Sequence, residues 1–203
     1  GCAKKRFENY KQQPLEFVFD KSFTGKLSQF GLDPNRRTPS GIKAAIIREK
    51  GTNGEREMAY MLYLAGFDVK DVTMTDLISG RETLEDINMV VYCGGFSNSD
   101  VLGSAKGWAG SFLFNPKAKA ALDNFYARED TLSLGVCNGC QLMMELGLIT
   151  PEDKKKGKML HNDSHKFESN FLGVTVPMNR SVMFGSLSGS KLGIWVAHGE
   201  GKF

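Results

Sequence analysis

Short apolar runs alternate along the chain with segments whose apolar residues recur at helical spacing. The runs at residues 42–47, 89–92 and 132–134 are mostly apolar at successive positions, which indicates strands buried on both faces, as in a parallel sheet covered by helices. This alternation predicts an α/β fold with a mostly parallel sheet flanked by helices. The strands expected in the sheet are residues 42–47, 67–74, 89–92 and 132–134.

Helical spacing is clearest in three segments, two of which stop at a glycine, the residue that most often follows the last helical turn. The expected helices are residues 54–64 before Gly66, 117–126, and 140–146 before Gly147. Beyond this point the pattern weakens, and residues 158–170 are expected to form a loop. Residues 172–176 and 193–197 are expected to be later strands, for which an antiparallel pairing is left open.

The first forty residues hold no sustained helical or strand period. They contain Pro14, Pro34 and Pro39 together with scattered phenylalanines, a composition typical of a linker or arm that lies on a surface. We therefore expect residues 1–40 to be an arm from a preceding domain and residues 41–203 to be one domain. A chain of 203 residues, 41% of them hydrophobic, is long enough to bury one substantial core.

The composition of the chain excludes only a few classes of protein. A net charge of +3 is too small and too scattered to predict a nucleic-acid partner. The chain has four cysteines without the spacing of a disulfide framework, no signal peptide, and no apolar run near the length of about 18 residues that spans a membrane. We therefore expect a cytoplasmic protein with reduced cysteines and no membrane segment.

The strongest chemical signal is the sequence GVCNG at residues 135–139, which falls between a predicted strand and a predicted helix. It is the cysteine counterpart of the Gly-x-Ser-x-Gly nucleophile elbow, in which the glycines let strand and helix approach closely. Such a turn holds Cys137 in a strained, outward-pointing position at the carboxyl end of the strand, where ligands of parallel sheets bind. Because the N-terminus of the following helix also favours a thiolate, we predict that Cys137 is a nucleophile.

Two other classes of protein remain open. Cys137 and Cys140 form a Cys-x-x-Cys pair at the start of a helix, as in thioredoxin-like redox proteins, although Gln141 after the pair has no role in redox chemistry. The chain could instead be a non-catalytic module that binds a partner. No metal site is expected, because the sequence has no second Cys-x-x-Cys and no histidine pair with ligand spacing.

The segment LGVCNGCQLM, residues 134–143, resembles the glutaminase elbow of class I glutamine amidotransferases. Its Asn-Gly-Cys-Gln form is similar to that of the phosphoribosylformylglycinamidine synthase family of purine biosynthesis. Further matches to this family follow in order and together cover residues 42–203; they are residues 48–58, 65–69, 93–97, 100–103 and 197–201. The resemblance implies a flavodoxin-like fold that hydrolyses glutamine through a cysteine thioester and supplies ammonia.

A glutaminase attacks an unactivated amide, so it needs a thiolate, donors for the oxyanion, and a base. We predict the backbone N–H groups of Asn138 and Gly95 as the oxyanion donors, by analogy with elbow hydrolases. The resemblance implies that Gln141 and Gly94 help to hold the substrate glutamine.

The base is the harder residue to place. In the family, the His and Glu that complete the triad lie in a C-terminal His-Pro-Glu motif, which this sequence lacks. By resemblance, His198 and Glu200 match a separate loop at the rim of the active site. We therefore expect a glutaminase domain that stops before the catalytic pair, with His198 as an alternative base.

The resemblance further implies that ammonia passes to synthetase domains of the same polypeptide, which use ATP to amidate formylglycinamide ribonucleotide. This sequence contains no Gly-x-x-x-x-Gly-Lys-Ser/Thr phosphate-binding loop. ATP and magnesium are therefore expected in the synthetase domains, and no cofactor is expected in this one. The expected partners are glutamine and the synthetase domains, with neither nucleic acid nor membrane.

Overall fold

The structure, a computed structural model, describes residues 2–9, 15–152 and 157–203. The chain forms two compact units. One, here called the α/β unit, consists of Leu27–Lys166 and Gly199–Phe203; the other, the hairpin unit, consists of Gly1–Lys26 and Phe167–His198. The domain boundary expected after residue 40 stays a prediction, because it concerns the relation of this chain to another domain.

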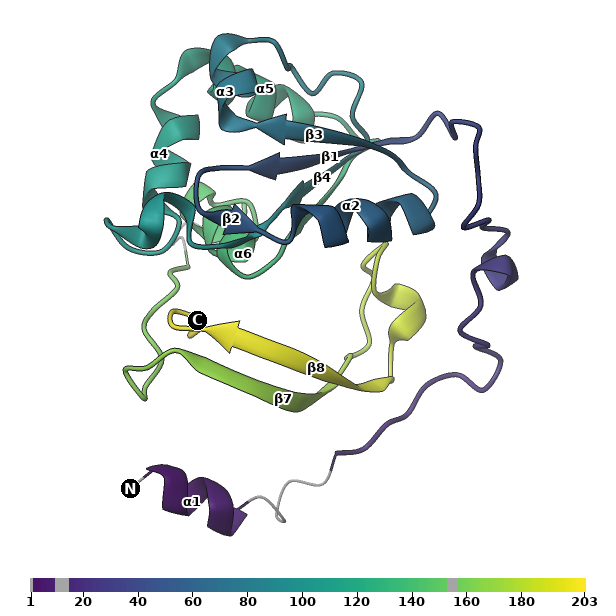
Figure 1. Ribbon diagram of the computed structural model, residues 1–203, viewed down its shortest axis with the longest axis vertical. Helices are drawn as coiled ribbons and strands as arrows, with labels where there is room; N and C mark the ends of the chain where they lie inside the picture. Colours follow the sequence, from purple (N-terminus) through teal and green to yellow (C-terminus); the bar gives the residue numbers. More distant parts are fainter. Residues whose placement is uncertain (1, 10–14, 153–156) are drawn as a thin grey trace. The chain divides into compact units, whose positions relative to one another are not determined.

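The α/β unit is built on a four-stranded parallel sheet with the strand order β3-β1-β4-β6 (Figure 1). This order matches the first four strands of a flavodoxin-like sheet. The strands are β1 Lys43–Arg48, β3 Asp68–Thr73, β4 Met89–Tyr92 and β6 Leu132–Gly135. Each lies within one residue of its predicted bounds at either end, so the mostly parallel sheet predicted from the apolar runs is confirmed.

Helices flank this sheet, with α2 on one face and α3 and α5 on the other (Figure 1). The helices are α2 Glu55–Leu64, α3 Met74–Ser79, α4 Lys106–Leu113, α5 Pro116–Tyr126 and α6 Asn138–Leu146, with the 3-10 turns η2 Leu27–Phe30 and η3 Ser97–Asp100. A short antiparallel ribbon pairs β2 Thr52–Asn53 with β5 Gly94–Gly95. Of the helices, α2, α5 and α6 were predicted from their spacing, although α6 begins two residues before the expected start at residue 140.

The sequence pattern missed α3 and α4. The first has only six residues, fewer than two turns, and the second contains two glycines that weaken its helical signal. Tertiary packing stabilises α4 instead, because Trp108 and Phe112 are fully buried. Their rings pack against the Tyr92 ring in T-shaped geometry, with centroid distances of 6.1 and 6.3 Å, respectively. A buried aromatic side chain of this kind contributes about 1.5–3 kcal/mol through its burial.

One ion pair links the segment before β1 to the start of β3, and another links the end of β1 to β3. Arg36, in the segment that precedes β1, donates to the Asp68 carboxylate at 2.7 Å and to the Phe67 carbonyl at 2.7 Å. Hydrogen bonds from Arg36, and next from the backbone N–H groups of Ser40 and Gly41, lower the pKa of the Asp68 carboxyl to about 2. Residues 27–40 are thus tied to the α/β unit.

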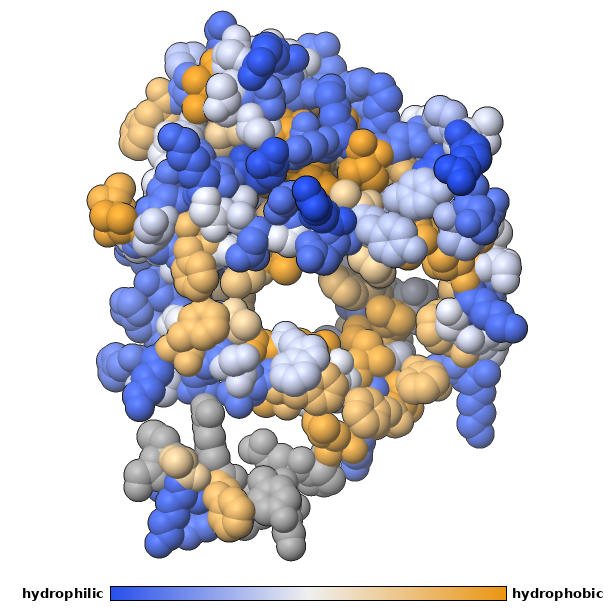
Figure 2. Space-filling model, in the orientation of Figure 1, coloured by the Kyte–Doolittle hydropathy of each residue, from blue (hydrophilic) through white to orange (hydrophobic). Residues whose placement is uncertain are grey.

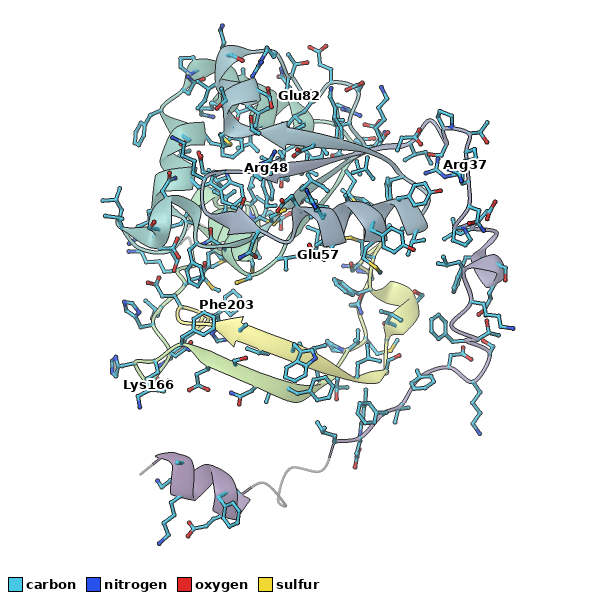
Figure 3. All side chains as sticks on the ribbon, in the orientation of Figure 1. Arg37, Arg48, Glu57, Glu82, Lys166 and Phe203 are labelled. Carbon is cyan, nitrogen blue, oxygen red and sulfur yellow. The ribbon has the colours of Figure 1, made fainter. Side chains whose placement is uncertain are left out.

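At the other end of β1, two nitrogens of the Arg48 guanidinium bind the two oxygens of the Asp71 carboxylate, at 2.7 and 2.8 Å. Figure 3 labels Arg48 on its strand. Both side chains are partly exposed, so this pair contributes little to stability, typically less than about 1 kcal/mol.

The hairpin unit contains an antiparallel pair, β7 Glu168–Thr175 and β8 Lys191–His198, with the 3-10 turn η4 Gly185–Leu187 before β8 and the helix α1 Cys2–Asn9. Hydrophobic side chains gather over the hairpin (orange in Figure 2). Phe171 and Trp195 face each other across the two strands, with ring centroids 5.0 Å apart, and Trp195 is 77% exposed.

One expectation is wrong in this unit: the loop expected at residues 158–170 ends earlier, because β7 begins at Glu168. The strands expected at residues 172–176 and 193–197 correspond to β7 and β8, and their pairing, left open by the sequence, is antiparallel. Residues 1–40 contain α1, which is too short for a periodic pattern to reveal, and their role as an arm stays a prediction. Within the described residues, no helix has the length and apolar character needed to cross a membrane.

Candidate functional site

Cys137 lies at a sharp turn between β6 and α6. Its backbone has φ 53° and ψ −111°, a conformation that costs a non-glycine residue roughly 1–3 kcal/mol and that occurs mainly at functional sites. The side chain is exposed. The turn therefore has the strained, outward-pointing geometry that the elbow pattern predicts.

The two glycines of the elbow allow backbone segments to touch. A Cβ atom on Gly139 would lie 2.1 Å from the Tyr92 carbonyl oxygen, and one on Gly135 would lie 2.6 Å from the Gly139 carbonyl oxygen. Both distances are far below van der Waals contact and involve backbone atoms that cannot move aside. Glycine is required at both positions because α6 packs directly on the ends of β4 and β6.

The second glycine turn lies beside the cysteine. A Cβ atom on Gly94 would be 3.2 Å from the Cβ of Cys137, so residue 94 borders the nucleophile position directly. Gly95 has φ 114° and packs so closely on the backbone of Thr52 that a Cβ atom would lie 2.7 Å from its Cα. The turn after β4 and the turn after β1 thus meet at the carboxyl edge of the sheet.

The register of the β2–β5 ribbon decides where the N–H of Gly95 points. Phe96, not Gly95, donates its N–H to the Gly51 carbonyl at 2.8 Å, and Thr52 lies opposite Gly95. In an antiparallel ribbon this makes Thr52 and Gly95 a non-hydrogen-bonded pair, whose N–H groups point away from the partner strand. The N–H of Gly95 is therefore directed away from β2, as an oxyanion donor must be.

The side chain of Asn138 is completely buried and fully hydrogen-bonded. Its Oδ1 accepts the N–H of Ser97 at 3.0 Å, and its Nδ2 donates to Asp100 Oδ1 at 3.1 Å and to Gln141 Oε1 at 2.9 Å. Both amide hydrogens and the carbonyl oxygen are used. As the first residue of α6, Asn138 has a backbone N–H without a helical partner.

Gln141 continues this network. Its Nε2 donates to the backbone carbonyl of Glu200 at 2.7 Å, and its side chain is buried. The Glu200 carboxylate in turn accepts the N–H of Ser104 at 3.4 Å, and its other oxygen lies 3.6 Å from Nδ1 of His161. The structure therefore places Gln141 and Glu200 in contact, while a substrate-holding role for Gln141 stays a prediction.

His198 is the last residue of β8 and lies opposite Glu168 in the hairpin unit, whereas Glu200 belongs to the α/β unit. The role of His198 therefore stays a prediction. Within the α/β unit, the histidine that approaches the Glu200 carboxylate is His161, which sequence reasoning did not single out.

Cys93, Cys137 and Cys140 differ in their surroundings, and all three are present as thiols. Burial raises the pKa of the Cys93 thiol to about 11. Burial, and next the neighbouring Cys137, also raises the pKa of the Cys140 thiol. A raised thiol pKa lowers the fraction of Cys140 that is present as thiolate at neutral pH.

Sequence reasoning also missed Ser97 and Asp100. Both fall within motifs that match the family, but their contacts with Asn138 join segments that lie 41 and 38 residues apart, and no periodic pattern reveals such contacts. The only local signal is the cluster of glycines and small polar residues around them, which is typical of a loop.

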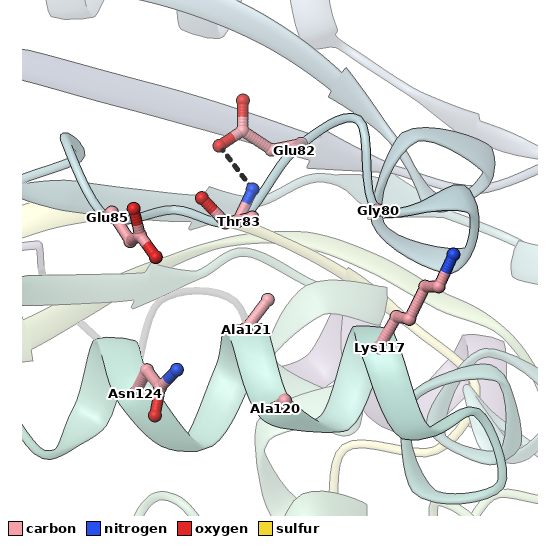
Figure 4. Close-up of a pocket in the computed structure, with 8 residues that line it drawn as sticks. All are labelled: Gly80, Glu82, Thr83, Glu85, Lys117, Ala120, Ala121 and Asn124. Carbon is pink, nitrogen blue, oxygen red and sulfur yellow. Dashed lines mark hydrogen bonds between the residues drawn. The ribbon is translucent and has the colours of Figure 1, made fainter.

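A separate hollow of about 300 Å³ lies beside α5 and the loop that follows α3 (Figure 4). Two of its charged side chains, those of Glu82 and Lys117, are engaged in the fold. Glu82 accepts the N–H groups of Thr83 and Leu84 at 2.9 and 2.7 Å, and Lys117 donates to the Ser79 carbonyl at 2.9 Å. None of the predicted site residues lines this hollow, which is formed by Gly80, Glu82, Thr83, Glu85, Lys117, Ala120, Ala121 and Asn124. Across the part of the chain that the structure describes, no group of three or more His, Cys, Asp or Glu side chains is placed to hold a metal ion.

Comparison with known proteins supports one family over residues 41–203. A family model described as a CobB/CobQ-like glutamine amidotransferase domain matches residues 41–203. The chain is 48% identical over 166 residues to the probable phosphoribosylformylglycinamidine synthase, chloroplastic/mitochondrial, of Arabidopsis thaliana, covering 79% of this chain and 12% of the relative. It is 44% identical over 173 residues to phosphoribosylformylglycinamidine synthase of Drosophila melanogaster, covering 83% of this chain and 13% of the relative.

Among solved structures, the chain is similar to one described as the structure of PurLQS from Thermotoga maritima. The TM-score is 0.62 with 26% sequence identity, and the match covers 79% of this chain and 68% of that one. The chain spans only about an eighth of the length of the curated relatives, 12% and 13% in the two cases above.

Proposed function

The chain belongs to the CobB/CobQ-like glutamine amidotransferase family, and from this membership we propose that it is the glutaminase domain of a phosphoribosylformylglycinamidine synthase. The identity of 44–48% to proteins of that name supports the choice of synthase. The observation that carries the proposal is the exposed, strained Cys137 at the elbow, with the Gly94 turn in direct contact with it.

In this proposal, the thiolate of Cys137 attacks the side-chain amide carbon of glutamine. The carbonyl π electrons move onto oxygen, and the N–H groups of Asn138 and Gly95 bind the resulting oxyanion. When the oxyanion collapses, the C–N bond breaks, the nitrogen takes up a proton, and ammonia leaves a γ-glutamyl thioester. Water then attacks the thioester, releases glutamate and returns the thiol. The net reaction consumes glutamine and water and yields glutamate and ammonia.

Preorganised oxyanion donors account for a large part of such catalysis, because removing one typically lowers kcat about 10²–10³-fold. The backbone positions of both donors are fixed by contacts within the α/β unit: the Thr52 pairing for Gly95 and the start of α6 for Asn138. Gly94 and Gln141 are proposed to border the bound glutamine, and His198 and Glu200 to lie at the rim of the site.

The partners and cofactors of the whole enzyme belong to the same proposal. We propose that ammonia passes to synthetase domains that use ATP and magnesium, with residues 1–40 as the connection from a preceding domain. No step proposed for this chain involves ATP or magnesium. We also propose a cytoplasmic location.

The test is Cys137→Ala in the full-length protein. Glutamine-dependent synthesis of the amidine should be lost, while synthesis driven by added ammonium should continue at the wild-type rate, because the synthetase chemistry lies elsewhere. The control is Cys93→Ala, which removes a buried thiol and should leave the ratio of the two activities unchanged. Normal glutamine-dependent turnover by Cys137→Ala would exclude Cys137 as the nucleophile.

A redox function makes the opposite prediction. Under mild oxidant, a redox pair would form a disulfide between Cys137 and Cys140, detectable by mass spectrometry of the digested protein. We expect Cys137 to be modified alone by a glutamine-like electrophile, with no such disulfide.

A further inference from the structure

The turn that carries Gly95 and the helix that begins with Asn138 are joined by one buried side chain. Asn138 supplies a proposed oxyanion donor from its backbone, and its side-chain oxygen holds the N–H of Ser97, two residues beyond Gly95, at 3.0 Å. The distance between the two donors therefore depends on how the Asn138 amide is oriented.

That orientation is set by Asp100 together with the N–H of Ser97, which can only donate and therefore needs the amide oxygen. A terminal amide fits equally well by shape when its oxygen and nitrogen are exchanged, so its neighbours must decide. The carboxylate of Asp100 only accepts hydrogen bonds when ionised, and it faces Nδ2 of Asn138 at 3.1 Å from Oδ1 and 3.4 Å from Oδ2. This contact forces the nitrogen toward Asp100 and the oxygen toward the N–H of Ser97.

The backbone around Asp100 is strained. Asn98, Ser99 and Asp100 have φ values of 51°, 56° and 49°, all in the left-handed region that non-glycine residues avoid. Strain of this kind persists only where surrounding contacts hold it, and it gathers at functional sites. Here the contacts include backbone hydrogen bonds, such as that from the N–H of Asn98 to the Lys50 carbonyl at 2.7 Å, and those of the Asp100 carboxylate, whose Oδ1 also accepts the N–H of Ala105 at 3.1 Å.

We propose that Asp100 is a positioning residue for the oxyanion hole, acting through the side chain of Asn138 on the turn that carries Gly95. This inference rests on the proposed glutaminase function. Asp100 itself does not touch the substrate in this proposal. It fixes the spacing of two donors that must both reach one oxygen atom.

The experiment uses Asp100→Ala in the full-length protein, with glutamine hydrolysis as the assay. Because a displacement of about 1 Å in a catalytic group can cost up to roughly 10²-fold, we expect kcat to fall about 10–100-fold. The KM for glutamine should change less than about threefold, because an interaction realised mainly in the transition state affects kcat rather than binding.

A second readout separates positioning from general damage. Iodoacetamide alkylates the Cys137 thiolate by displacement, in which the S–C bond forms, the C–I bond breaks and iodide leaves, so no oxyanion develops. We expect Asp100→Ala to react with iodoacetamide at Cys137 at the wild-type rate. Asp100→Asn keeps an oxygen that can occupy the place of Oδ1, and it should restore most of kcat.

The matched control is Asp123→Ala, which removes an exposed carboxylate on α5 and should leave every readout unchanged. If Asp100→Ala fails to fold, as its Tm would reveal, Asn138→Ser takes its place. That variant keeps the backbone N–H, loses the bridge to Ser97, and should show the same separation between turnover and alkylation.

Wild-type kcat in the Asp100→Ala protein, or an equal loss of turnover and alkylation, would overturn the inference. A failure of the proposed function is recognisable separately: the wild-type protein would then hydrolyse no glutamine, or Cys137→Ala would hydrolyse it as well as wild type.

Discussion

At the scale of single residues, the elbow depends on two glycines, whose lack of a Cβ atom lets the backbone segments touch. Gly139 approaches the Tyr92 carbonyl so closely that a Cβ atom would lie 2.1 Å from it. We expect Gly139→Ala to destabilise the protein by about 1–3 kcal/mol or more, since the backbone must shift to accept the methyl group. Glutamine hydrolysis should be lost in the same variant. Urea denaturation and the glutaminase assay measure the two effects.

The comparison variant is Gly110→Ala on α4. A Cβ atom there would meet the Phe114 ring at 3.6 Å, an ordinary contact. Alanine in a helix is more stable than glycine by about 0.5–1 kcal/mol, so this variant should be at least as stable as wild type. Equal destabilisation by the two substitutions would mean that the elbow does not need its close approach.

The thiols should react in a definite order. The pKa of Cys93 is about 11, so pH 8 lies about 3 units below it and only roughly one Cys93 thiol in a thousand is ionised. The thiol is also buried. Burial raises the pKa of Cys140 as well, whereas Cys137 is exposed. We expect iodoacetamide to label Cys137 well before the other two, as followed by peptide mass spectrometry over time. Simultaneous labelling of Cys137 and Cys140 would contradict this order.

Sequence alone could identify Cys137 because the elbow is a local pattern, in which the glycines stand at fixed positions around one residue. It could not identify Asp100, because what matters there is the contact with Asn138 across 38 residues of sequence. Gln141 shows the same limit. Its place after the cysteines could be read from the sequence, but its hydrogen bond to the Glu200 carbonyl could not.

At the scale of elements, the segment before β1 is held to the start of β3 by a carboxylate whose pKa is lowered. Asp68 has a pKa of about 2 in the folded protein, below the value near 3.9 of an unfolded chain. A lowered pKa adds stability that is fully present above the unfolded pKa and is lost as the pH falls toward 2. We therefore expect the stability advantage of wild type over Asp68→Asn to shrink steadily between about pH 5 and pH 2.

The check is urea denaturation of both proteins across this pH range. Arg36→Gln removes the main cause of the lowered pKa and should reduce the same pH dependence. A stability difference that stays constant from pH 5 to pH 2 would show that the Arg36–Asp68 contact is not maintained in solution.

The elements that sequence could predict are those with a strong pattern of their own. The strands β1 and β4 lie in mostly apolar runs, and β1 is buried at its four central positions, so the runs alone revealed them. By contrast, the first three residues of β7, 168–170, are polar and pair with β8, and α4 is stabilised by the burial of Trp108 and Phe112. Such elements depend on the tertiary structure, which a local pattern does not contain.

At the scale of the whole molecule, burial predicts where the backbone is most protected. The central strands β1 and β4 are nearly inaccessible, whereas the strands of the hairpin unit are partly or fully exposed along their length. We expect amide hydrogen exchange to be slowest in β1 and β4 and much faster in β7 and β8, because exchange from exposed elements needs only local opening. Mass spectrometry of labelled peptides measures this, and equal protection of the two units would contradict it.

The α/β unit is discontinuous in sequence, and this has a consequence for its biosynthesis. The link from Gln141 to Glu200 joins residues 59 positions apart, and the hairpin strands are synthesised between them. At roughly 5–20 residues per second, a ribosome needs about 3–12 seconds to cover that interval. During this time the elbow has been synthesised, but Glu200, whose carbonyl accepts the hydrogen bond from Gln141, has not. Cys137 is thus synthesised before the last residue that supports its turn, and its exposed thiol spends that interval without this support.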